Sequence, residues 1–336
     1  MDVSADSHRD PGVMSKLSGI AEHILQRHGA DFSEARRAGG WSNATWLAGG
    51  LALRIAVEVG THHLRREAGL AGLLPPAVGY PQVVASGVTD GYEWLLAKKI
   101  AGRNLSELWP TLDWDARIGA IRQLWAKAES VHRVNVVAAR AVARSSSPFY
   151  SHSKEEAAAS LTRLEQAGVL AGRRQVTVLG DALDRFWAAI PAARAVLNHG
   201  DLCTENALWD DGQVVALLDF EYAMCAPVEL DLNELIKAAY APPEHEDLLP
   251  DQGHGRARLQ QVVADIAVAT AVTVSSADLL LGYAILLELW SMQRQLSKWN
   301  GVVSFAAWQP YRAIASLSDG AGGYLAPVLV RLAPAS

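Results

Sequence analysis

Residues 198–221 constrain this chain more than any other part of its 336 residues. The stretch reads Asn-His-Gly-Asp-Leu, reaches Asn206 four residues later, and ends in Asp-Phe-Glu at 219–221. Between the two motifs an Asp-Gly pair, Asp211-Gly212, separates two apolar runs. Such a pair predicts a β-hairpin with a two-residue type I′ turn, because glycine tolerates the positive φ that this turn requires.

The predicted hairpin brings oxygen ligands together. Its register is expected to place Asn206 opposite Leu217, so that Asp219 lies at the open end of the hairpin beside Asn206 and within reach of Asp201. Two carboxylates and one amide oxygen are the ligands that Mg²⁺ prefers, usually together with phosphate oxygens. The stretch therefore predicts a magnesium site.

The same residues allow other interpretations. His199, Asp201 and Cys203 could form a transition-metal site, but a zinc site with a thiolate ligand usually has a second Cys/His pair, and none follows at a suitable spacing. A serine-type hydrolase is disfavoured, because no G-x-S-x-G motif occurs.

The two motifs resemble the catalytic and metal-binding loops of the aminoglycoside phosphotransferase family, the small-molecule branch of the protein-kinase-like fold. The run 199–202 matches the family's His-Gly-Asp-Leu, and Asn206 has the family spacing. The resemblance implies an α+β, bilobal protein-kinase-like fold, with a small β-rich N-lobe on a five-stranded antiparallel sheet and a larger, mostly helical C-lobe. We expect residues 1–100 to form the nucleotide-binding N-lobe with an N-terminal helix, and residues 101–336 the C-lobe with the catalytic loop and acceptor pocket.

The first hundred residues show the patterns of such a lobe. Apolar residues recur at helical spacing over residues 15–28, and five strand patterns follow between Arg36 and Ile100. A glycine-rich turn between the first two strands contains Gly40, Ser42 and Asn43. Its backbone N–H groups are candidates to hold nucleotide phosphates, as in kinase glycine-rich loops; an ordinary hairpin is the alternative.

A charged pair is expected between the third strand and the inserted helix. Arg54 interrupts an apolar strand and needs a partner there, because an unpaired charge is costly to bury. Glu67, in a helix expected over 61–74 with Thr61 as N-cap, is the natural partner. By resemblance, Arg54 stands where the family has its nucleotide-phosphate lysine and Glu67 where it has the glutamate of helix C; an ordinary surface ion pair is the alternative.

The fifth strand leads into a segment similar to the family's hinge, Ile100-Ala101-Gly102-Arg103-Asn104-Leu105. The resemblance implies that backbone groups near Ala97 to Ile100, Lys98 included, hold the purine edge. Because such contacts involve the backbone, the sequence does not distinguish ATP from GTP.

The C-lobe is expected to be helical. A long amphipathic helix is predicted over 115–134 and further helices over 155–166, 180–190, 259–274, 277–296 and 304–317. Asp231 matches the family aspartate that braces the catalytic loop through hydrogen bonds. Residues 318–336, rich in Gly and Pro, are predicted to be a loosely packed tail.

The resemblance assigns roles to the loop residues. Asp201 is expected to orient the acceptor hydroxyl and accept its proton, and Asn206 and Asp219 to hold Mg²⁺ on the phosphates of ATP or GTP. Glu221 could face a substrate amine, touch the metal or be solvated. Glu288 and Trp290 are further candidates for acceptor binding.

Bulk properties exclude several classes. The formal charge of −6 and pI near 5.9 argue against a nucleic-acid partner. We also expect no membrane partner, because no run of about eighteen apolar residues occurs. Two cysteines and a polar N-terminus without an apolar signal region indicate a cytoplasmic protein.

The acceptor is inferred from charge. Between residues 221 and 290 there are eleven acidic residues and three basic ones. An acidic wall attracts cations, so we expect a small-molecule O-phosphotransferase acting on a cationic antibiotic, aminoglycoside-like or cyclic peptide, and conferring resistance. The alternatives are a macrolide kinase, a metabolite kinase of the choline or homoserine type, and a nucleotide-binding pseudokinase scaffold.

Overall fold

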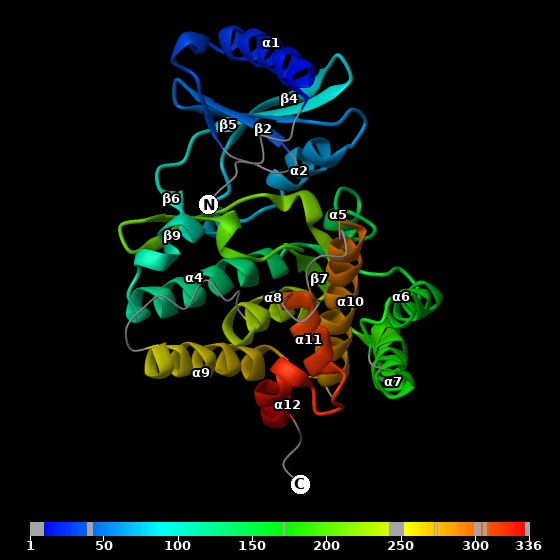
Figure 1. Ribbon diagram of the computed structural model, residues 1–336. Coiled ribbons are helices and arrows are strands. Elements are labelled where there is room, and N and C mark those ends of the chain that lie inside the picture. Colours follow the sequence, from blue (N-terminus) through cyan, green and yellow to red (C-terminus); the bar gives the residue numbers. More distant parts are fainter. Residues whose placement is uncertain are drawn as a thin grey trace.

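The computed structural model describes residues 10–38, 43–170, 172–241, 252–271, 273, 275–298, 304 and 308–332. A small lobe built on a β-sheet lies above a larger helical lobe (Figure 1). This arrangement confirms the bilobal, protein-kinase-like α+β fold.

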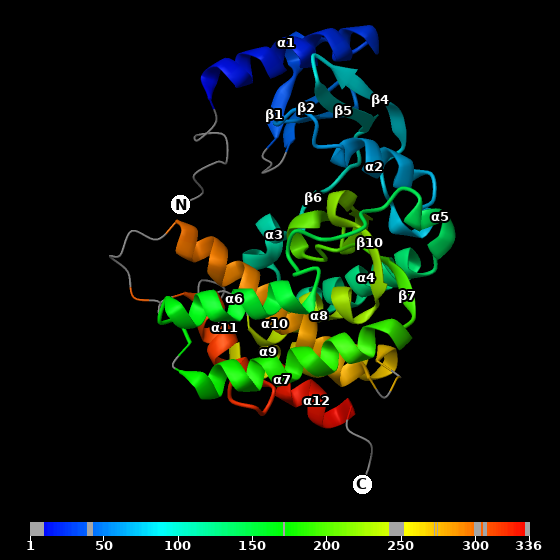
Figure 2. The ribbon, with the colours of Figure 1, turned by 90° about the vertical axis from the view of Figure 1, so that its right-hand side faces the viewer.

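The small lobe contains a five-stranded antiparallel sheet in the order β1-β2-β3-β5-β4. Its strands are β1 (Arg36–Ala38), β2 (Asn43–Ala48), β3 (Leu51–Ala56), β4 (Val83–Thr89) and β5 (Tyr92–Lys98). Helix α1 (Pro11–Arg27) covers the sheet on the side away from the helical lobe (Figures 1 and 2). Helix α2 (His63–Ala71) lies on the side facing that lobe.

The two helices of this lobe differ from expectation at their ends. Helix α1 already begins at Pro11, because Asp10 accepts the Gly12 N–H and proline suits the first helical turn. Helix α2 begins at His63, so Thr61 is not its N-cap. Instead the chain enters α2 through His62, whose φ of 58° is left-handed.

The large lobe consists mainly of helices. They are α3 (Leu105–Leu108), α4 (Trp114–His132), α5 (Val136–Arg140), α6 (Lys154–Gln166), α7 (Arg173–Ala189), α8 (Glu229–Tyr240), α9 (Gln252–Thr270), α10 (Ser276–Ser297), α11 (Gln309–Leu317) and α12 (Ala326–Leu332). Helix α10 is buried on most sides and packs against α6, α7, α8 and α11, so it forms the centre of this lobe.

Short strands carry the motifs from Asn198 to Glu221. Strand β6 (Arg103–Asn104) pairs with β8 (Ala207–Asp210), which forms a hairpin with β9 (Gln213–Leu217). Strand β7 (Ala195–Asn198) pairs with β10 (Met224–Pro227). The two motifs thus lie between these small sheets, on the side of the helical lobe that faces the N-lobe (Figure 2).

Several predictions about the C-lobe were wrong. Helix α9 begins at Gln252 rather than Leu259. Helix α7 begins at Arg173 rather than Gly180. The C-terminal tail is not loose throughout, because α12 forms within it and Leu325 and Val328 are fully buried. Glycine and proline content suggested a loop there, but burial of these apolar side chains outweighs it.

Among the described helices, none combines the length and apolarity that a membrane crossing needs.

Candidate active site

The β8–β9 hairpin forms at the predicted turn. Asp211 and Gly212 have φ values of 42° and 78°, both positive as a type I′ turn requires. The register shifts between Leu208 and Trp209, and Leu218 N–H donates to the Asn206 carbonyl over 2.7 Å. Asn206 therefore lies opposite Leu218, and the predicted position opposite Leu217 was wrong. The β-bulge that shifts the register was not recognisable in the sequence.

Asp201 and Asn206 are in direct contact. Asn206 Nδ2 donates to the backbone oxygen of Asp201 over 2.9 Å and to its Oδ2 over 3.0 Å. Burial raises the pKa of Asp201, and His199 and the bond from Asn206 oppose that shift only in part. Asp201 is thus a carboxylate with one oxygen fixed by Asn206 and a raised proton affinity, as suits a group that accepts a proton.

Asp231 holds the catalytic loop through hydrogen bonds to its backbone. The fully buried carboxylate accepts the backbone N–H groups of His199 over 2.8 Å and of Gly200 over 2.9 Å, and it lies 2.9 Å from His132 Nε2. Burial would raise the pKa of Asp231, but its bond with His132 and the neighbouring charges outweigh burial and lower it. The hydrogen bonds expected of Asp231 are therefore present.

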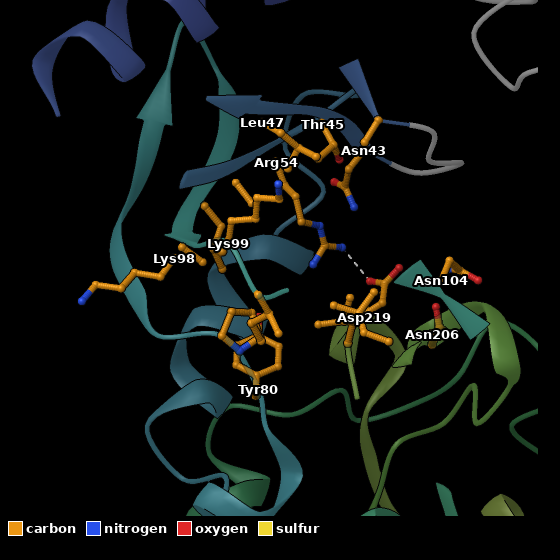
Figure 3. A pocket seen from close by; sticks show the side chains of 18 of the residues that line it. Asn43, Thr45, Leu47, Arg54, Tyr80, Lys98, Lys99, Asn104, Asn206 and Asp219 are labelled. Carbon is orange, nitrogen blue, oxygen red and sulfur yellow. Dashed lines mark hydrogen bonds and ion pairs between the residues drawn. The ribbon is translucent and has the colours of Figure 1, made fainter. Parts of the chain in front are cut away.

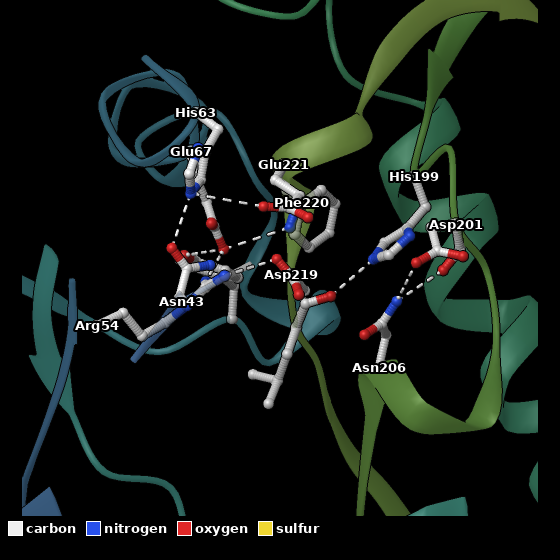
Figure 4. Close-up of polar contacts among 12 residues, drawn as sticks. Asn43, Arg54, His63, Glu67, His199, Asp201, Asn206, Asp219, Phe220 and Glu221 are labelled. Atoms are coloured by element: carbon white, nitrogen blue, oxygen red, sulfur yellow. Dashed lines mark hydrogen bonds and ion pairs between the residues drawn. The ribbon is translucent and has the colours of Figure 1, made fainter. Parts of the chain in front are cut away.

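Gly200 is required in this loop for two reasons. Its φ is +84°, and a Cβ added there would lie 2.3 Å from the Tyr222 carbonyl oxygen. The loop also bonds to the residue that precedes Asp219, since His199 Nε2 lies 2.7 Å from the Leu218 oxygen (Figure 4). The loop and the Asp219 segment therefore form one hydrogen-bonded unit.

Arg54 connects the N-lobe to that unit. Its Nη1 lies 2.6 Å from Glu67 Oε1 and its Nη2 lies 2.6 Å from Asp219 Oδ1 (Figure 4). The Tyr80 hydroxyl also donates to Glu67 Oε1, over 2.8 Å. Glu67 is 0% exposed, so the pair is not an ordinary surface ion pair.

Electrostatics keep Arg54 charged. Burial would lower the pKa of Arg54, but the carboxylates of Asp219 and Glu67 outweigh burial and raise it. Burial raises the pKa of Glu67, and the attraction of Arg54 opposes that shift. A planar guanidinium can contact two carboxylates at once, which a lysine ammonium does with less geometric control.

A cleft of about 310 Å³ lies between the lobes at this point (Figure 3). Apolar side chains from the sheet and the hairpin line one part of the cleft, and Arg54 and Asp219 face each other in its polar part. It brings together most of the predicted nucleotide and metal residues: Asn43, Arg54, Glu67, Lys98, Ile100, Asn206 and Asp219. The remaining two, Gly40 and Ser42, lie outside the described residues.

The donor set beside the cleft suits a hard cation. Asp219 offers a carboxylate, and Asn206 turns its Nδ2 toward Asp201, so its Oδ1 points away from that residue (Figure 4). Oxygen donors of this kind fit Mg²⁺. Within the part of the chain that the structure describes, no cluster of three or more His, Cys, Asp or Glu side chains could hold a metal, which contradicts the alternative of a His199-Asp201-Cys203 site.

The candidates for acceptor binding are arranged less simply. Glu221 is 5% exposed, with Oε2 lying 3.6 Å from His63 Nε2, so it is not a solvated carboxylate. Glu288 is fully buried and pairs with Lys237 Nζ over 2.7 Å. Trp290 is half-buried and packs edge-on against Phe149.

The expected acidic wall is reduced by partners within the protein. Glu229 accepts from Ser276, Asp265 pairs with Arg331, and Asp278 pairs with Arg185. Four of the eleven acids, Glu244, Glu246, Asp247 and Asp251, lie outside the described residues. Among the described acids counted there, Glu234 is the one that lines a pocket beside the catalytic loop. This pocket has a volume of about 220 Å³ and is also lined by Lys237, Cys203 and Thr204.

Three site residues were not singled out from the sequence. His63 could have been found, because it lies one helical turn before Glu67 and shares its face. Glu234 was one of many acids, and nothing local distinguished it. Tyr80 follows a proline-rich turn and carries no sequence signal for a contact with a residue 13 positions away.

A sheet lobe and a helical lobe, joined across a cleft by an arginine that contacts the aspartate after a hairpin, define a kinase-like phosphotransferase. The model of the phosphotransferase enzyme family, APH, matches residues 34–266. Because this match covers more than half of the chain, the protein belongs to that family. It is a phosphotransferase that takes a hydroxyl group as acceptor.

Solved structures agree with this fold. A mutant of aminoglycoside phosphotransferase APH(4)-Ia, in complex with ADP and hygromycin B, has a TM-score of 0.61 at 12% identity, covering 91% of this chain and 99% of that one. Wild-type aminoglycoside 2′-phosphotransferase-IIIa with GDP has a TM-score of 0.62 at 15% identity, covering 90% and 98%. A choline/ethanolamine kinase family protein from Mesorhizobium loti has a TM-score of 0.58 at 18% identity, covering 95% and 99%. No curated protein sequence matches the chain.

Proposed function

We propose that the protein transfers the γ-phosphate of ATP or GTP to a hydroxyl group of a cationic small molecule. The observation that carries this proposal is that two residues lining one cleft contact the two key side chains: Asn206 bonds to Asp201, and Asp219 pairs with Arg54. Phosphoryl transfer needs both parts: a group that orients the nucleophile, and positively charged groups that contact the phosphates and neutralise their charge.

Each residue has a role in this scheme. Asp201 Oδ1, the oxygen that Asn206 does not contact, accepts the proton of the acceptor hydroxyl as the new O–P bond forms and the bond between the β- and γ-phosphates breaks. Arg54 contacts the phosphates, and Asn206 and Asp219 hold Mg²⁺. When bound, Mg²⁺ neutralises the charge on the phosphate oxygens.

The nucleotide base is expected at the apolar end of the cleft. Strand β5 ends at Lys98, and residues 98–100 line the cleft together with Leu47 and Leu208. We place the boundary between the two lobes near residue 100, just after the last strand of the N-lobe sheet ends at Lys98. The need for a nucleoside triphosphate agrees with a cytoplasmic location.

A cationic acceptor is favoured by the pocket at Glu234. Burial raises the pKa of Glu234 to about 7, and Lys237 is already paired with Glu288. When Glu234 is ionised, it and Glu288 are two carboxylates beside the one ammonium of Lys237, and a cationic acceptor would balance the remaining negative charge. Two of the solved structures above are described as acting on aminoglycosides, and we propose an aminoglycoside-like or cyclic peptide antibiotic as acceptor, with resistance as the result.

A metabolite kinase is the second candidate. At about 220 Å³ the Glu234 pocket is smaller than the roughly 300–1,000 Å³ of most ligand pockets. That size suits a small amino alcohol of the choline or homoserine type.

Mass spectrometry of reaction products tests the proposal. The purified protein is incubated with Mg²⁺ and ATP or GTP, and with aminoglycosides, cyclic peptide antibiotics, macrolides, choline, ethanolamine or homoserine. We expect a product heavier by one phosphoryl group with a cationic compound. Transfer only to a macrolide would contradict the cationic acceptor, and nucleotide binding without transfer to any compound would favour a scaffold.

A further inference from the structure

Helix α2 directs two side chains at the site from one face. His63 and Glu67 lie four residues apart, so both point the same way. Glu67 holds Arg54, as described above. His63 contacts two other residues, one from the N-lobe sheet and one from the segment that follows Asp219 (Figure 4).

The contacts of His63 are buried. His63 Nε2 lies 2.7 Å from Asn43 Oδ1 and 3.6 Å from Glu221 Oε2. His63 is 7% exposed, Asn43 3% and Glu221 5%. Burial and the charge of Arg54 lower the pKa of His63 to about 4, so the ring is neutral near pH 7. Because an amide oxygen only accepts, the Nε2–H of the neutral ring donates to Asn43.

The two partners of His63 belong to the two segments that carry proposed phosphate and metal residues. Asn43 is the first residue of β2 and lines the cleft. Glu221 lies two residues after Asp219, and the Phe220 N–H in between donates to Glu67 Oε1 over 3.3 Å. One helical face therefore fixes both the start of β2 and the segment that carries Asp219.

We propose that His63 is a positioning residue for phosphoryl transfer, which holds Asn43 at the start of β2 in register with the Asp219–Glu221 segment. This inference rests on the proposed function. A buried histidine that only fills the core would contribute to stability alone. A positioning residue sets the distance between the phosphates and Asp219, and small displacements in such geometry slow a reaction strongly.

Kinetics of His63 variants test the inference. His63→Ala removes the donor, and His63→Gln keeps an amide N–H at a similar distance from the backbone. At saturating nucleotide we expect His63→Ala to lower kcat about 10- to 100-fold, while the KM for the acceptor changes less than about twofold. His63→Gln is expected to recover most of the lost kcat. His62→Asn is the matched control, because His62 is exposed, contacts Glu93 instead and needs a residue that tolerates positive φ.

The outcomes separate the two proposals. If the unmodified protein transfers no phosphate, the proposed function fails. If the protein is active and His63→Ala keeps its kcat within twofold, or His63→Gln is as slow as His63→Ala, the positioning role is wrong. Should His63→Ala not fold, His63→Gln and Asn43→Ala decide: near-normal kcat in Asn43→Ala would overturn the inference, because that variant lacks the acceptor of the same hydrogen bond. A double variant no slower than the slower single one would support it.

Discussion

Arg54 Nη2 lies 2.6 Å from Asp219 Oδ1, so a strand of the N-lobe is joined directly to the aspartate proposed to hold the metal. The same guanidinium contacts Glu67, which is completely buried. Three charged groups from three segments thus meet at one point of the cleft. Their mutual dependence leads to the first prediction.

Removal of Arg54 is expected to destabilise the protein. Arg54→Ala leaves the buried Glu67 carboxylate without its cation, which costs about 3 kcal/mol in the free energy of unfolding. Arg54→Lys keeps the charge but not the two-pronged contact, so we expect a smaller loss, of about 1 kcal/mol, and weaker nucleotide binding. Urea unfolding and a nucleotide titration measure both effects. Equal stability of the three proteins would show that Arg54 does not hold Glu67 and Asp219 together.

Asp201→Asn is expected to slow transfer without loss of nucleotide binding. The amide cannot accept the hydroxyl proton, so kcat should fall about 10²- to 10⁴-fold. Asp210→Asn serves as a control, because Asp210 is an exposed residue at the end of β8. Single-turnover rates with labelled ATP or GTP measure the effect. Turnover within a few-fold of the unmodified rate would remove Asp201 from the role of base.

Asp231→Asn is expected to lower stability and activity together. An amide presents an N–H group where the carboxylate accepted from His199 and Gly200, so at least one buried donor loses its partner. The expected cost is about 3 kcal/mol. Asp278→Asn, which removes one partner of a more exposed pair with Arg185, should cost less than about 1 kcal/mol. Thermal unfolding compares the two variants, and similar losses in both would contradict the bracing role of Asp231.

The acceptor pocket is expected to depend on pH through Glu234. Its pKa is raised to about 7 by burial, and Lys237, Asp201, Tyr150 and Glu288 are the charged or titratable groups around it. Below that pKa the side chain is neutral, and above it the side chain is ionised. The KM for a cationic acceptor should therefore fall as pH rises through about 7.

The raised pKa of Glu234 also makes the stability of the protein depend on pH. A carboxyl group whose pKa is higher in the folded state stabilises the protein below its unfolded pKa, and that contribution is lost as pH rises through the folded value. Glu234→Gln should abolish the pH dependence of KM around pH 7. It should also flatten the pH dependence of the free energy of unfolding between the ordinary pKa of 4.5 and about 7. Acceptor kinetics from pH 5.5 to 8.5, with tests at roughly unit steps, provide the measurement. A pH dependence that survives in Glu234→Gln would assign it to another group.

The sequence alone determined the active-site motifs and the fold class. Residues 199–206 and 219–221 are close in the chain, and a two-residue turn brings them together, so local rules were sufficient. The strand and turn patterns between Arg36 and Ile100 likewise predicted all five strands of the N-lobe sheet. The pairing of Arg54 with Glu67 followed from the cost of burying an unpaired charge.

Only the tertiary structure decided which partners the remaining charges have. Nothing in the local sequence shows that Arg54 also contacts Asp219, a residue 165 positions away, or that Glu288 pairs with Lys237. Charge counting suggested a continuous acidic wall, whereas packing brings several of those acids to Arg331, Arg185 and Ser276. The physical reason is that a buried or crowded carboxylate must find a donor or cation, and the fold, not the order of residues, determines which one lies within reach.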